Sequence, residues 1–141
     1  MKKIHLISII LALVFAHVMY ACDTITTYGT QIARSARYNI NGVRLNSIKS
    51  VLKQERANFY RYHGNNKYAQ KDTYFSKKSN RELFTSALLS ISPSLEKKIL
   101  GKDPIFITVT LFKPNLIKVE DGLSKPEKIK VLRHCSHQNT N

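Results

Sequence analysis

The N-terminal apolar segment determines which part of this chain can fold. Two lysines near the start are followed by residues 4–19, a mostly apolar run without Asp, Glu, Lys or Arg. A positive start, a short apolar run and then a small residue, here Ala21, are typical of a secretory signal peptide. A membrane-spanning helix would need about 20 apolar residues, which this run does not reach. The pattern predicts that residues 1–21 are removed on export and that the mature chain begins at Cys22.

The residues around the predicted cleavage position carry a second pattern, MYAC at positions 19–22. It resembles the lipobox of bacterial lipoproteins, in which apolar residues and a small residue precede the cysteine that is acylated. The resemblance covers residues 1–23 only. It implies a lipoprotein acylated at Cys22, anchored in a membrane and facing the periplasm or the cell exterior. Asp23 resembles the signal that keeps enterobacterial lipoproteins at the inner membrane. The alternative is ordinary cleavage after Ala21, which would give a secreted protein.

The sequence contains two cysteines, Cys22 and Cys135. In an exported chain, two cysteines suggest one disulfide. Such a bridge would close nearly the whole mature chain, and the loop-entropy model assigns it about 4–5 kcal/mol. An acylated Cys22 has no free thiol, so the two possibilities exclude each other. The chain has either a lipid with an unpaired Cys135 or a Cys22–Cys135 bridge without a lipid, as in a secreted disulfide-bonded factor.

Positive charge dominates the composition. The formal net charge is +14, and removal of the two signal-peptide lysines leaves +12. A balance of this kind favours anionic partners. We expect an acidic protein or an anionic lipid or glycan surface, with nucleic acid as a less favoured partner. The simpler interpretation is a solvated basic surface without a specific partner.

Hydrophobic patterning predicts a single α+β domain over residues 37–135. Hydrophobic residues make up 43% of the chain, which indicates a folded globule rather than a disordered tail. Residues 22–36 lack periodicity and are expected to form a tether or a disordered entry, and residues 136–141 a polar tail. Asn41-Gly42, between two short β-capable runs, predicts a hairpin over 37–45, because both residues tolerate the positive φ of a type I′ turn.

Three helices and a sheet are expected to follow this hairpin. Apolar residues at helical spacing predict one long amphipathic helix over 45–63, and they are Leu45, Ile48, Leu52, Phe59 and Tyr62. The capping box Ser79–Glu82 predicts a second helix that ends before Pro93. Ser92-Pro93 predicts a short third helix that ends at Gly101. The β-branched and aromatic runs at 105–112, 116–120 and 128–133 predict an antiparallel β-meander.

A basic and aromatic segment extends from Lys49 to Lys78. Cations of this kind bind anionic groups, while aromatic faces stack on bases or lie in a headgroup layer. The simpler interpretation places the rings in the core and the lysines in solvent. The predicted anion-binding residues are Lys49, Lys53, Arg56, Tyr60, His63, Lys67, Lys71, Lys77 and Lys78, of which the first five form one stripe of the predicted long helix.

Histidine chemistry is the basis of the main enzymatic alternative. His63 and His134, with Lys67 or Lys71, are the residue types of metal-free ribonuclease chemistry, which would make the chain a secreted effector or toxin. Nothing in the sequence brings the two histidines together. The metal-ligand types at 134–137 form too short a cluster to predict a metal site. The sequence contains no paired-carboxylate, phosphate-loop or metalloprotease motif, so we expect no catalytic residue, metal or cofactor.

These patterns predict a small, exported, strongly basic envelope lipoprotein or periplasmic accessory protein that acts by binding. Its size and expected location are similar to those of proteins that assemble a secretion or pilus system or inhibit an envelope protein, which is an analogy only.

Overall fold

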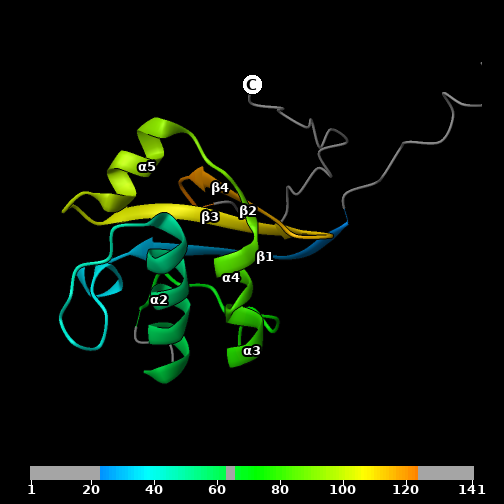
Figure 1. The fold of residues 1–141 in the computed structure, drawn as a ribbon, viewed down its shortest axis with the longest axis horizontal. Helices are drawn as coiled ribbons and strands as arrows, with labels where there is room; N and C mark the ends of the chain where they lie inside the picture. Colours follow the sequence, from blue (N-terminus) through cyan, green and yellow to red (C-terminus); the bar gives the residue numbers. More distant parts are fainter. Residues whose placement is uncertain (1–22, 63–65, 124–141) are drawn as a thin grey trace, which may run out of the picture. The chain divides into compact units, whose positions relative to one another are not determined.

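A four-stranded mixed sheet organises the computed structural model, which describes residues 23–62 and 66–123 (Figure 1). The strands are β1 (Thr24–Ile32), β2 (Leu88–Ser90), β3 (Ile105–Phe112) and β4 (Leu116–Asp121). Their order across the sheet is β1-β3-β4-β2, where β3 is antiparallel to both neighbours and β2 is parallel to β4. The predicted α+β class is confirmed. The predicted strand at 128–133 lies outside the described residues.

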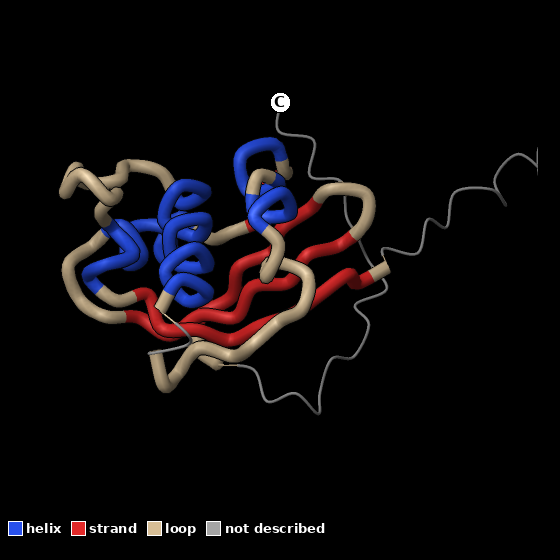
Figure 2. Tube along the Cα trace, turned by 90° about the horizontal axis from the view of Figure 1, so that it is seen from below, coloured by secondary structure: helices blue, strands red, loops and turns tan. Residues whose placement is uncertain are grey.

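The helices gather on one side of this sheet (Figure 2). Ser47 caps the longest helix, α2 (Ile48–Arg61), by accepting a hydrogen bond from the amide of Ser50. The shorter helical elements are η1 (Arg34–Arg37), α3 (Lys78–Arg81), α4 (Leu83–Ser86) and α5 (Pro93–Leu100). No helix in the described ranges is long and apolar enough to cross a bilayer.

The core lies between the sheet and the helices. Ile107, Val109 and Leu111 alternate along β3 and are fully buried, as the two-residue period of a strand requires. Val51 and Leu52 are the fully buried apolar residues of α2. Aromatic rings complete the core between loop and helix: Phe75 stacks on Phe84 with 4.5 Å between ring centres and meets Tyr28 edge-on at 5.8 Å.

The N-terminal part of the domain differs from the prediction. The expected tether over 22–36 is wrong for residues 24–32, because they form β1 and pair along the whole of β3. The expected hairpin over 37–45 is reduced to one isolated bridge between Tyr38 and Arg44, around a turn in which Gly42 has a φ of 74°. The helix expected over 45–63 spans Ile48–Arg61.

The middle of the chain also differs. Ser79 does not cap a long helix: α3 begins at Lys78, and a second short helix, α4, ends at Ser86. The residues that follow form β2, where a helical face was expected. By contrast, α5 begins at Pro93 with Ser92 as its N-cap and ends before Gly101, as predicted.

Candidate functional site

Arg56 of α2 is fully buried and lies at the centre of an ion-pair network. Its Nε and Nη2 donate to the two carboxylate oxygens of the neighbouring Glu55, both at 2.6 Å. Its Nη1 donates to Asp72 Oδ2 and to the carbonyl of Gln70, both at 3.0 Å. Thr30 of β1 donates to Glu55 Oε1 at 2.7 Å. The network therefore joins α2, the sheet and the loop that contains Asp72.

Aromatic rings enclose the guanidinium of this network. Its central carbon lies 4.0 Å from the ring centre of Tyr28 and 4.5 Å from that of Phe59. Burial alone would lower the pKa of Arg56, but the hydrogen bonds and charge of Glu55 raise it above its ordinary value. Arg56 is therefore a permanent internal cation. Its expected place in an exposed anion-binding stripe is wrong, because its side chain does not reach solvent.

Asp72 fastens the loop after α2 to that helix. Its Oδ1 accepts from the amide of Phe75 at 2.6 Å, and its Oδ2 accepts from the hydroxyl of Tyr60 at 2.9 Å. The Tyr60 hydroxyl also contacts the Asp72 backbone carbonyl. Burial, and then the hydrogen bond to Asp72, raise the pKa of Tyr60 to about 12. Tyr60, predicted to bind anions, is thus half-buried and bound within the fold.

Every carboxylate of residues 49–82 is paired with a cation of the same segment, so none is left to neutralise the other surface cations. Glu55 and Asp72 are buried against Arg56, and the exposed Glu82 accepts from Lys53 Nζ at 2.5 Å. That contact lowers the pKa of Glu82. Within the described part of the chain, seven cations of this segment then have no carboxylate partner; they are Lys49, Arg61, Lys67, Lys71, Lys77, Lys78 and Arg81.

A groove of about 440 Å³ opens where β1, η1 and the last turns of α2 meet. Its lining combines aromatic rings, side-chain amides and one cation; these are Phe59, Tyr62 and Tyr68, then Gln31, Asn58 and Asn66, and Lys67. Glu55 also lines it, with both oxygens held by Arg56 and Thr30. A second hollow of about 390 Å³ lies along α2 and includes Lys49 and Lys53.

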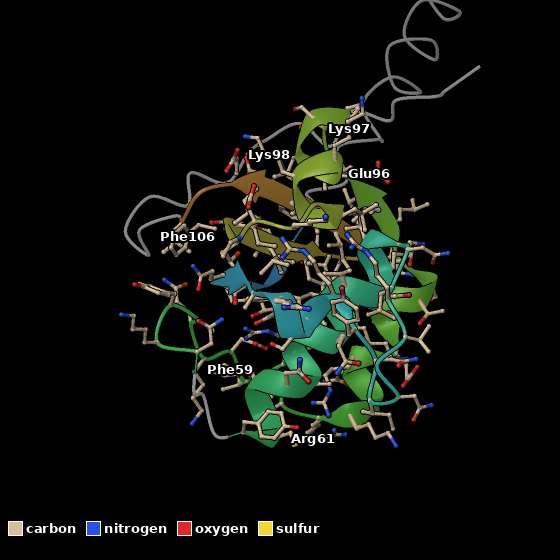
Figure 3. The ribbon with its side chains drawn as sticks, turned by 90° about the vertical axis from the view of Figure 1, so that its left-hand side faces the viewer. Phe59, Arg61, Glu96, Lys97, Lys98 and Phe106 are labelled. Atoms are coloured by element: carbon tan, nitrogen blue, oxygen red, sulfur yellow. The ribbon has the colours of Figure 1, made fainter. Side chains whose placement is uncertain are left out.

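Hydrogen bonds to backbone fix the walls of this groove. Asn66 donates to the carbonyl of Gln31 at 3.0 Å and accepts from the amide of Tyr68 at 3.1 Å. The Tyr68 ring meets Phe106 of β3 edge-on at 5.2 Å, and Lys67 Nζ lies 4.8 Å from the centre of the Tyr68 ring. Phe59 and Phe106 lie on the same side of the molecule in Figure 3, whereas Lys97 lies well apart on α5. These contacts therefore hold the wall of the groove in place without a ligand.

The structure brings only some of the predicted anion-binding residues to this groove. Lys67 lines it, and Lys71, Lys77 and Lys78 are exposed in the loop and α3 beyond it. His63, Cys22, Cys135, His134 and His137 lie outside the described residues. The amides of Gln31, Asn58 and Asn66 were not predicted, because neutral amides add nothing to a basic and aromatic pattern and Gln31 lies in the segment expected to be a tether.

A search for metal-ligand clusters and comparisons with known proteins add no further site in the described residues. Residues 23–62 and 66–123 contain no group of three or more His, Cys, Asp or Glu that could hold a metal ion. Comparison with protein-family models, curated proteins and solved structures finds no match to this chain. The function must therefore be argued from the groove and the charges themselves.

Proposed function

We propose that the protein is a small exported envelope protein that binds an acidic partner through the groove and the cations around it. The observation that carries this proposal is the internal pairing of carboxylates. Arg56 holds Glu55 and Asp72 inside the fold, and Lys53 holds Glu82 at the surface. The remaining cations of residues 49–81 are left to attract an anion, and an uncompensated patch of one sign concentrates ligands of the other.

The groove suits binding better than catalysis. Its carboxylate, Glu55, accepts three hydrogen bonds from Arg56 and Thr30. A general base needs an oxygen within reach of the proton that it removes, and both oxygens here are already engaged. Glu55 serves instead to hold α2 against β1 and so to fix the floor of the groove.

The proposed lipid on Cys22 would be attached at the start of β1, and the groove includes the strand's other end. Thr24, two residues after that cysteine, begins β1, and Gln31 of the groove lies near the other end of the strand. The nine residues of β1 span about 30 Å at the rise of an extended strand. A lipid anchor at one end would therefore leave the groove accessible to partners in the periplasm or outside the cell.

Charge reversal tests this proposal. The processed full chain is assayed for binding to an oligouronate, to polyglutamate and to anionic vesicles. One variant changes four exposed lysines to Glu; they are Lys67, which lines the groove, and Lys71, Lys77 and Lys78, which follow it in the unpaired basic segment. The matched control makes the same change of net charge elsewhere, at Lys97, Lys98, Lys102 and Lys113.

The first variant should lose binding to at least one polyanion, and the control should lose much less. Both should keep their thermal stability, because exposed charges contribute about 0–1 kcal/mol each. Equal losses in the two variants would show that net charge alone is responsible, and no binding to any polyanion by the unaltered chain would refute the proposal.

A further inference from the structure

We infer that the groove binds an acidic sugar unit of a glycan, through aromatic stacking, hydroxyl recognition and one carboxylate-binding cation. This inference rests on the proposed function, in which the chain binds an anionic partner, and it names the class of that partner. The groove volume, about 440 Å³, falls in the range of about 300–1,000 Å³ that small-ligand sites occupy.

The rings supply flat apolar walls. Tyr62 is 54% exposed and Tyr68 is 40% exposed, although both side chains line the groove. Tyrosine is enriched at binding interfaces, because its ring is apolar and its hydroxyl is polar. The C–H face of a pyranose ring is an apolar surface of matching dimensions, while its hydroxyl groups point outward toward polar groups.

Unused polar groups surround these rings. Gln31, Ser35 and Tyr62 line the groove, and their side-chain amide or hydroxyl groups make no hydrogen bond to any other residue that the structure describes. An amide offers two donors and an acceptor, and a hydroxyl offers both functions. Such groups complement sugar hydroxyls, which also donate and accept.

One cation in the groove indicates that the bound sugar carries an acidic group. Lys67 lines the groove and has no carboxylate partner within residues 23–62 and 66–123. The only carboxylate among the described lining residues, Glu55, is neutralised by Arg56 and would not repel an anion. A uronic acid unit would therefore place its carboxylate at Lys67.

The edge of β1 argues against an extended peptide as the ligand. A peptide commonly adds itself as a strand to a free sheet edge. Here Gln70 occupies that edge: its amide donates to the carbonyl of Gly29 at 2.8 Å, and its side-chain oxygen accepts from the Gly29 amide at 2.8 Å. The backbone groups of Gly29 are thus already paired, and Asn66 donates to the carbonyl of Gln31 beside the groove.

The test measures binding of an oligogalacturonate, its neutral galactose counterpart and polyglutamate to the processed full chain. Tyr62→Ala and Gln31→Ala should each weaken oligogalacturonate binding about tenfold, and Lys67→Ala by a similar factor. The controls Ile40→Ala and Lys97→Ala change an exposed apolar and an exposed basic residue outside the groove. They should alter binding less than about twofold. The neutral oligosaccharide should bind about tenfold more weakly than the acidic one.

Three results would overturn the inference. Oligogalacturonate binding that resists Tyr62→Ala, Tyr62→Phe and Gln31→Ala, but is lost on charge reversal at Lys67, Lys71, Lys77 and Lys78, would refute the groove as the site and leave the proposed function standing. Polyglutamate binding that Tyr62→Ala and Gln31→Ala weaken to the same extent would refute the inference that the ligand is a glycan. No polyanion binding at all would refute both proposals. Circular dichroism of each variant separates loss of binding from loss of fold.

Discussion

At the scale of single residues, Arg56 determines both the interior and the surface of the domain. A buried cation is tolerated only when partners replace the water that it lost. Glu55, Asp72 and the carbonyl of Gln70 do so here, and the rings of Tyr28 and Phe59 complete the enclosure. By the same contacts, Arg56 withdraws two carboxylates from the surface and leaves the nearby lysines unpaired.

Replacement of Arg56 by Met should destabilise the domain strongly. The change would leave Glu55 and Asp72 buried without a counter-charge, and breaking a buried pair in this way costs about 3–5 kcal/mol. Urea unfolding of the variant measures the loss. Arg61→Met provides the control, because Arg61 is an exposed cation on the same helix and its loss should cost less than about 0.5 kcal/mol. Similar small losses for both variants would contradict the structural role of the network.

Tyr28 and Tyr60 should make the domain sensitive to alkali. Burial raises the pKa of Tyr28 well above its ordinary value, and burial followed by the hydrogen bond to Asp72 raises that of Tyr60 to about 12. In the unfolded chain both phenols lose their protons near pH 10. Their contribution to stability is therefore complete below about pH 10 and is lost as the pH rises toward 12.

Urea unfolding between pH 9 and 12 tests this expectation. The free energy of unfolding should fall across the window, and it should fall less in the double variant Tyr28→Phe, Tyr60→Phe. Tyr62→Phe, which changes an exposed ring, should follow the unaltered protein. If the double variant lost stability with the same slope as the unaltered protein, lysine titration rather than the buried phenols would account for the effect.

At the scale of elements, α2 links the core to the groove. Its inner side is made by Ile48, Val51 and Leu52, while Phe59 and Leu45 are only half-buried beside them. Leu52→Ala should lower the free energy of unfolding by about 2–5 kcal/mol, because the side chain is fully buried and its truncation leaves a cavity. The control Tyr62→Ala removes a large exposed ring of the same apolar pattern and should cost less than about 0.5 kcal/mol. A loss below that value for Leu52→Ala would mean that this stripe is an exposed binding face.

The elements that could be predicted from the sequence are those with local signals. Ser92-Pro93 predicted the start of α5, and the continuous β-branched run at 105–112 predicted β3. The failures have a common physical cause. β1 is polar and Thr-rich, and it is a strand because it pairs with β3, which lies more than 70 residues later in the chain. β2 is held by β4 in the same way, and its sequence alone favours a helix.

The candidate site was predictable only in part, for related reasons. Composition indicated a basic, aromatic surface, and Lys67 with its neighbours was identified from it. The burial of Arg56 could not be foreseen, because it depends on Asp72 being folded back onto α2 from 16 residues away. Gln31 was missed because the groove needs β1 in place, and β1 is defined by non-local pairing.

At the scale of the whole molecule, the proposed function includes a lipid anchor at the N-terminus. This arrangement requires that Cys22 is the mature N-terminus and is acylated, as the MYAC pattern at 19–22 predicts. Intact-mass analysis should show a lipid-sized gain, and Cys22→Ala should move the protein to the soluble fraction. An unmodified N-terminus with a Cys22–Cys135 bridge would instead indicate a secreted protein, free of the membrane.

The salt dependence of oligogalacturonate binding tests the central claim, electrostatic capture of an acidic partner, most directly. Salt weakens the attraction between exposed charges that are more than about 10 Å apart at 0.1 M, or more than about 3 Å apart at 1 M. Between these two concentrations, the unaltered chain should lose about tenfold or more in affinity. The variant with Glu at Lys67, Lys71, Lys77 and Lys78 should bind weakly at both concentrations. An affinity that stays constant over this range, in both proteins, would contradict the account.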